Sequence, residues 1–205
     1  MSLVNLLQQR GDLWRGADYS PVVQPGMPTG FDFLDQQLVG SGWPRGAVTE
    51  ILTDDREGRG GLGLVVPSLA ALSREARWIV LVGPPLIPYA PGLVARGVDI
   101  SRLLLLYPRG QQERLWALEQ ALRSDACSAV LGWLGRVSAG ALRRLQLAAA
   151  VGKSGGFLFR PVQVAQESSP VALRLRVRPA GEEVELEILK RRGSWPLGGV
   201  RISAN

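Results

Sequence analysis

The alternation of short apolar runs with longer segments of helical periodicity constrains the fold of this chain more than any other feature. It extends from residue 47 to residue 159. The predicted strands are residues 47–52, 78–82, 103–107, 129–133 and 156–159, and the predicted helices are residues 62–73, 88–96, 111–123 and 139–151. Because helices of crossover length join parallel strands, we expect a mostly parallel sheet with helices on its faces, an α/β fold.

The chain changes character after residue 170. Apolar residues alternate with arginine over residues 171–178 and with glutamate over residues 183–188. Such alternation on both sides of a turn predicts a C-terminal antiparallel hairpin with one apolar face. The expected register pairs each arginine with a glutamate, as Arg178–Glu183, Arg176–Glu185 and Arg174–Glu187. The arginine row is therefore predicted to be a neutralised outer face.

The composition excludes several kinds of chemistry. The chain has no histidine, and Cys127 is its one cysteine. Disulfides within the chain, zinc clusters and Cys–His nucleophiles are thus excluded, and we expect no metal and no cofactor. Cys127 precedes an apolar run and is predicted to be buried and unreactive. The net charge of +6 favours a polyanionic neighbour without indicating where it binds.

The length of 205 residues predicts one domain with small appendages. We divide it into an N-terminal helix and linker arm (1–28), a core that includes the hairpin (29–189) and a basic C-terminal tail (190–205). The chain shows no leader segment and no apolar run long enough to cross a bilayer, so we expect a cytoplasmic protein that does not bind membranes.

A Gly-rich loop follows the first predicted strand and leads into a helix. This geometry holds phosphates when the loop carries two glycines, a lysine and a hydroxyl for magnesium. The corresponding positions are Thr53, Gly58, Arg59 and Gly60. Gly60 offers no oxygen to a metal, and three acidic residues lie nearby, so we expect poor nucleotide binding. An ordinary Gly-rich surface loop accounts for these residues without any ligand, and this is the interpretation that we prefer.

Residues 29–133 resemble the start of the ATPase core of RecA. The segments that carry the resemblance are residues 29–35, 40–51, 97–100 and 119–124. It implies a RecA-like three-layer core with an N-terminal arm. The catalytic positions that it implies fall on Arg59, Gly60, Pro85, and either Gly132 or Trp133. None carries the residue that the RecA mechanism requires as metal ligand, general base or phosphate clamp, so we expect the chain not to be an enzyme.

The chain more closely resembles ImuA. The segments that carry this resemblance are residues 13–16, 42–44, 83–91, 115–123, 144–149, 168–170 and 190–193. It implies an accessory protein of the SOS-induced mutasome that supports error-prone translesion DNA synthesis. ImuB is the implied partner, an error-prone polymerase III α-subunit paralogue is an indirect one, and RecA and DNA remain open as further partners.

Residues for binding are predicted from exposed aromatic and basic groups. Trp14, Arg15 and Trp195 lie in terminal segments and are candidate partner contacts, whereas Trp43 is expected to fill a gap in the core. The candidate nucleic-acid contacts are Arg143, Arg144, Lys153, Lys190, Arg191, Arg192 and Arg201. A solvated helix face and a charged tail are the alternative interpretation of these basic residues.

Two other functions remain open. One is a cell-division inhibitor like SulA, which shares the reduced RecA-like core and binds FtsZ. The long N-terminal stretch and residues 42–44 speak against it. The other is a modulator of RecA filaments that binds single-stranded DNA, for which a salt-sensitive interaction is expected.

Overall fold

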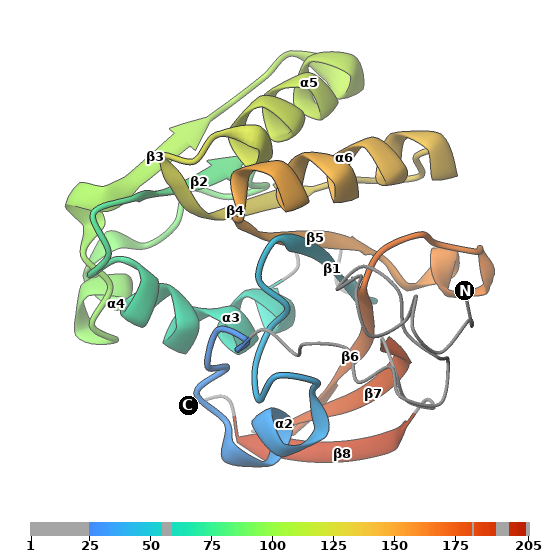
Figure 1. The fold of residues 1–205 in the computed structure, drawn as a ribbon. Helices are drawn as coiled ribbons and strands as arrows, with labels where there is room; N and C mark the ends of the chain where they lie inside the picture. Colours follow the sequence, from blue (N-terminus) through green and yellow to red (C-terminus); the bar gives the residue numbers. More distant parts are fainter. Residues whose placement is uncertain (1–24, 55–58, 182, 192–196, 204–205) are drawn as a thin grey trace, which may run out of the picture.

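The computed structural model describes residues 25–54, 59–181, 183–191 and 197–203, and every structural statement below concerns these residues. They form an eight-stranded sheet in the order β3-β2-β4-β5-β1-β6-β7-β8 (Figure 1). The strands are β1 (Ala47–Thr53), β2 (Trp78–Val82), β3 (Leu103–Leu106), β4 (Cys127–Trp133), β5 (Gly155–Pro161), β6 (Leu173–Ala180), β7 (Glu183–Arg191) and β8 (Leu197–Ser203). The helices are α2 (Asp32–Gln37), α3 (Arg59–Leu72), α4 (Ala90–Ala95), α5 (Gly110–Arg123) and α6 (Ala139–Gly152), with short 3-10 turns η1 (Ile100–Arg102) and η2 (Val162–Gln166).

The mostly parallel sheet and the C-terminal antiparallel hairpin are confirmed. Strands β1 to β6 pair in parallel, and β7 pairs antiparallel with both β6 and β8. Helices cover both faces of the parallel part: Figure 1 shows α5 and α6 on one side and α3 and α4 on the other. Ile51 and Phe157 belong to the apolar core on the α3 side, and Val48 and Leu145 to the core on the α6 side.

Strand β8 was not predicted. The sequence analysis assigned residues 190–205 to a tail, but residues 190 and 191 complete β7, and residues 197–203 pair with it. The glycines at positions 198 and 199 weaken the alternation that identifies a strand. The predicted helix over residues 1–10 lies outside the described residues. The domain boundaries at 28 and 189 stay predictions, although Met27 is buried and forms a β-bridge with Trp43.

The hairpin register differs from the predicted one by two residues. Glu183 lies opposite Ala180. Each arginine therefore pairs with the glutamate two residues later than predicted, Arg178 with Glu185 and Arg176 with Glu187. Because β6 continues to Ala180, the chain must reverse within two residues, and Gly181 with a φ of +70° permits this. The shift by two does not change which face of the hairpin residues 175–180 and 183–188 occupy. A bulge after Arg174 then places that residue opposite Lys190 instead of a glutamate.

Trp43 fills the core, as predicted. Its side chain is fully buried, and its Nε1 donates a hydrogen bond to Ser68 Oγ at 2.8 Å. The indole meets the Phe157 ring edge to face, with centroids 5.5 Å apart. The loop before β1 is thereby attached to α3 and β5, which fixes where the first strand begins.

Cys127 is buried at the start of β4, as predicted, and burial raises the pKa of its thiol. A group whose pKa is raised by folding contributes stability that is fully present below its unfolded pKa of about 8.5 and is lost as the pH rises through the folded value. The free energy of unfolding should therefore fall more steeply above about pH 8.5 in the natural protein than in Cys127→Ala. Urea titrations from pH 7 to 10 would measure this, and equal slopes would contradict it.

Candidate protein-binding surface

The start of α3, which follows the predicted phosphate loop, packs against apolar side chains. Thr53 ends β1, and a methyl group on Gly61, in the first turn of α3, would lie 3.0 Å from side-chain atoms of Ile51 and Phe159. Phe159 stacks on Trp133 with ring centroids 4.8 Å apart. The start of α3 thus rests on an aromatic pair. Gly58 and the side chain of Arg59 lie outside what is described, and poor nucleotide binding stays a prediction.

The other predicted catalytic positions are equally unsuited to chemistry. Pro85 is exposed in the loop after β2, and Gly132 lies against Leu118, so closely that a methyl group there would be 2.6 Å from a leucine carbon. Among the described residues, no group of acidic residues, cysteine or histidine could hold a metal ion. Nor does the described part of the chain contain a helix that is long and apolar enough to span a membrane.

The predicted nucleic-acid contacts lie on separate elements. Arg144 on α6 forms an ion pair with Glu119 of α5 at 3.4 Å, while Arg143 and Lys153 are exposed on or just after the same helix. At the other end of the sheet, Lys190 donates to the Ser169 carbonyl at 2.6 Å.

Arg191, also on β7, donates to the Gln37 carbonyl, and Arg201 is exposed on β8. Arg192 and the predicted partner contacts Trp14, Arg15 and Trp195 lie outside the described residues. Contact with nucleic acid by the described basic residues stays a prediction.

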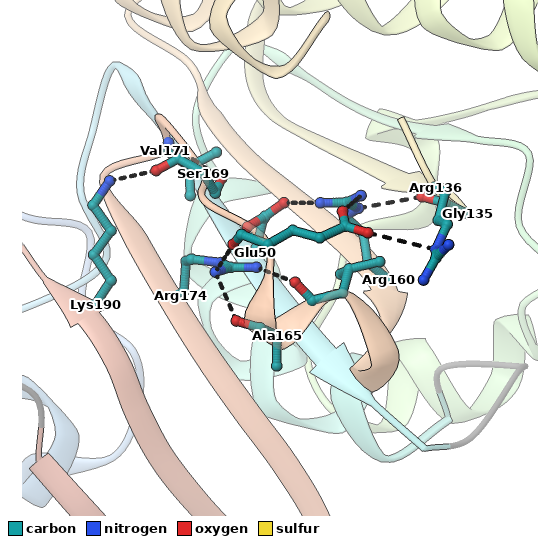
Figure 2. A network of polar contacts seen from close by, with 11 residues as sticks. Glu50, Gly135, Arg136, Arg160, Ala165, Ser169, Val171, Arg174 and Lys190 are labelled. Atoms are coloured by element: carbon teal, nitrogen blue, oxygen red, sulfur yellow. Dashed lines mark hydrogen bonds and ion pairs between the residues drawn. The ribbon is translucent and has the colours of Figure 1, made fainter. Parts of the chain in front are cut away.

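A buried ion network centred on Glu50, which was not predicted from the sequence, connects three strands of the sheet (Figure 2). Glu50 lies in the middle of β1, between Arg160 of β5 and Arg174 of β6. One carboxylate oxygen accepts from the Arg160 guanidinium, and the other accepts from Arg174 Nε at 2.6 Å. All three side chains are buried. Sequence reasoning placed Arg174 on a neutralised outer face, which is wrong because β6 lies beside β1 and η2 covers this part of the sheet.

Main-chain carbonyls satisfy much of the remaining donor capacity of the two arginines. Arg174 donates to the carbonyls of Val164, Ala165 and Glu167 at 2.9, 3.2 and 2.8 Å. Arg160 Nε donates to Gly135 O at 3.3 Å. The network therefore ties η2 and the loop after β4 to the three central strands. A single charged residue within an otherwise apolar strand, as at Glu50, was the signal that could have revealed it.

The ion pairs at the solvent-exposed end of this network are longer than those of Glu50. Glu167 lies 3.9 Å from Arg160 and 3.4 Å from Arg136, both longer than good hydrogen bonds. Its side chain is half exposed, and that of Arg136 is largely exposed. Glu167 thus partly neutralises the positive charge of Arg160 and Arg136 at the solvent-exposed end of the network.

A group of exposed apolar side chains follows β2. We call it the β2–α4 surface and define it by Leu86, Ile87, Tyr89 and Val94. Ile87 is 82% and Tyr89 74% exposed, whereas isoleucine is among the residue types that are most often buried. The Tyr89 ring lies over Gly92, where a methyl group would come within 2.9 Å of it. Apolar groups that are exposed together in this way mark interaction sites.

The base of the β2–α4 surface is held in place. Gly83 turns the chain out of β2 with a φ of +61°, and a methyl group at this position would collide with the Arg114 guanidinium, coming within 2.6 Å of its Nε. Arg114 in turn donates to Trp133 O at 3.1 Å. The buried Pro84, the exposed Pro85 and the half-buried Pro88 further restrict the loop. The apolar side chains are therefore presented by a restrained backbone.

Residues 46–156, slightly more than half of the chain, match the family model of the cell division inhibitor SulA. The chain belongs to the SulA family. A SulA of Photorhabdus laumondii is 34% identical over 106 residues, which are 52% of this chain and 60% of that protein. For a SulA of Edwardsiella piscicida the identity is 37%, over 48% of this chain and 58% of the relative. This chain therefore spans about 60% of the length of these two relatives.

Other SulA proteins give a similar result. A SulA of Yersinia pestis is 30% identical over 56% of this chain and 68% of its own length. The crystal structure of SulA from Pseudomonas aeruginosa is 30% identical, covers 55% of this chain and 97% of that chain, and superposes with a TM-score of 0.47.

The interpretation as an ImuA protein is wrong, and so are the mutasome function and the partner ImuB that it implied. The matched region contains residues 83–91, 115–123 and 144–149, which had carried that resemblance. The N-terminal stretch and residues 42–44, which spoke against SulA, lie outside residues 46–156 and therefore do not bear on the family. Both interpretations predict the same alternation of strands and helices, so the pattern did not separate them.

Proposed function

We propose that this SulA-family chain inhibits bacterial cell division by binding FtsZ through the β2–α4 surface, without catalysing a reaction. One observation carries the proposal: four large apolar side chains are exposed on one restrained loop and short helix inside the region that matches the SulA model. An inhibitor that acts by binding needs a surface of this kind and no catalytic centre.

The charge and burial of the surrounding residues support this proposal. The sequence between Gly83 and Val94 contains no charged residue, so this segment itself brings no charge that a partner would have to desolvate. Ile87 and Tyr89 are of the size that anchors protein interfaces, and the restrained backbone lowers the entropy lost on binding. We also propose that the core is RecA-like, since α3 is the next element after β1 along the chain, as a helix follows the first core strand in that fold.

The proposal is tested by binding and by the phenotype of cells. Purified chain should bind immobilised FtsZ in surface plasmon resonance, and its expression should produce elongated, undivided bacteria. The matched control is Val151→Asp, a substitution on the outer face of α6 at a side chain that is 68% exposed. This control should behave like the natural protein in both experiments. Normal division together with no detectable binding would overturn the proposal.

A further inference from the structure

The ion network around Glu50 contains more positive than negative charge. Its buried part pairs the single carboxylate of Glu50 with the guanidinium groups of Arg160 and Arg174. Two further charged side chains, Glu167 and Arg136, lie at its solvent-exposed end. These three arginines and two glutamates leave one excess positive charge. Because a buried charge is costly unless it is paired, the network favours a further anion.

Arg160 has a hydrogen-bond donor that no described residue uses. Its side chain is 1% exposed, its Nη1 donates to Glu50, and its Nε donates to Gly135 O at 3.3 Å. Its Nη2 is buried as well, and it lacks a hydrogen-bond partner in the described part of the chain. The carboxylate of Glu167 lies 3.9 Å from Nη2, which is beyond hydrogen-bonding distance. An unused donor on a buried cation calls for a negatively charged acceptor.

The main chain of Glu167 limits how closely its carboxylate approaches the two arginines. Glu167 N donates to Val164 O at 3.0 Å, and Glu167 O accepts from Arg174 Nη1 at 2.8 Å. From this fixed position the carboxylate lies 3.4 Å from Arg136 Nε and 3.9 Å from Arg160 Nη2. Figure 2 shows the side chains of Arg160 and Arg136 near each other at this end of the network. A free anion has no such tether, so it can contact both guanidinium groups.

The loop after β4 offers space and a favourable potential for an anion. A methyl group on Gly135 would have no neighbour within 4 Å, so the space beside it is open. Gln111 Nε2 donates to Arg136 O at 2.9 Å and thereby holds the loop. Helix α6 starts three residues after Arg136, and its cap Ser138 accepts from Ala141 N at 3.2 Å. The remaining free N–H groups of the first helical turn favour negative charge nearby.

We propose that the solvent-exposed end of this network is a binding site for a phosphate group, which accepts hydrogen bonds from Arg160 Nη2 and from the guanidinium of Arg136. Arginine binds phosphate oxygens through parallel N–H donors, and a phosphate with more than one negative charge offsets the excess positive charge. The bound phosphate takes the place of the Glu167 carboxylate, which is half exposed and turns toward solvent. Inorganic phosphate and a phosphomonoester share this chemistry.

The test measures the thermal midpoint of the purified chain while inorganic phosphate replaces chloride at constant ionic strength, so it does not depend on the proposed FtsZ binding. A ligand of the folded state raises the midpoint according to its dissociation constant. At a phosphate concentration tenfold above that constant, the midpoint of the natural protein should rise by about 3–6 °C. Phosphoserine is titrated in parallel. Tighter binding of phosphoserine would identify a phosphomonoester as the ligand and weaker binding the free ion, and both results agree with the proposal.

Three variants separate this site from general effects of phosphate. Arg136→Gln changes a side chain that is 76% exposed, so the protein should stay folded while the phosphate dissociation constant rises at least about tenfold. The matched control is Arg96→Gln, which removes the same charge at an exposed residue after α4, on the other face of the sheet (Figure 1). Glu167→Gln removes the competing carboxylate and should lower the dissociation constant at least about twofold.

Three results would overturn the proposal. The first is a midpoint of the natural protein that does not respond to phosphate. The second is an equal response of the natural protein and Arg136→Gln, because phosphate would then act only as a stabilising salt. The third is weaker phosphate binding by Glu167→Gln, because the glutamate would then support the site instead of competing for it.

Discussion

Replacement of Glu50 by glutamine is expected to lower the free energy of unfolding by about 3–5 kcal/mol. The neutral amide would leave the buried guanidinium of Arg174 without a counter-charge and that of Arg160 with only the more distant carboxylate of Glu167. The amide nitrogen, which is a donor, would also face an arginine donor. Urea denaturation at neutral pH measures the effect.

The matched control for this experiment is Glu167→Gln in the same network. Glu167 is half exposed and lies 3.4 and 3.9 Å from its arginine partners, so its loss should cost no more than about 1 kcal/mol. Equal effects of the two substitutions would show that Glu50 is not the centre of the network. A loss below about 1 kcal/mol for Glu50→Gln would contradict the buried ion pairs themselves.

Ile87→Asp and Tyr89→Ala are each expected to weaken binding to FtsZ at least about 30-fold, which corresponds to about 2 kcal/mol. Aspartate at position 87 would have to be desolvated in the interface without a partner, and alanine at position 89 would remove the larger of the two anchors. Both side chains are mostly exposed in the free protein, so the thermal midpoint should change little.

Surface plasmon resonance with immobilised FtsZ measures this loss, and Val151→Asp serves as the control because it adds the same charge on the distant face of α6. Retention of full affinity by both variants would show that FtsZ, if bound, contacts another part of the chain. Loss of affinity in the control as well would indicate a general effect of added negative charge.

Local pattern predicted the secondary structure well within the matched region. The predicted strand over residues 78–82 coincides with β2, and the predicted helices over residues 111–123 and 139–151 differ from α5 and α6 by one residue at one end. The spacing of apolar residues reflects which side chains are buried. Strands of a parallel sheet that is covered by helices on both faces are buried on both sides, so they appear in the sequence as continuous apolar runs. The short segments that resemble ImuA, by contrast, indicated the wrong family.

The β2–α4 surface was harder to predict from the sequence than the secondary structure. Leu86, Ile87 and Tyr89 were visible only as part of a Pro-rich run, because nothing in a local pattern tells an exposed isoleucine from a buried one. The terminal residues Trp14 and Trp195 were favoured instead, and both lie outside the described residues. Exposure depends on which elements pack over a loop, and that is a property of the assembled fold.

The amino-acid sequence by itself determined the alternating elements, the hairpin and the burial of Trp43 and Cys127, because each follows from side-chain type and periodicity over short distances. Only the tertiary structure decided the strand order, the two-residue shift of the hairpin and the meeting of Glu50 with Arg160 and Arg174. Glu50 is separated from these two arginines by 110 and 124 positions along the chain. The three residues meet because β5, β1 and β6 are neighbours in the sheet, an order that is set when the apolar faces of the sheet pack against the helices.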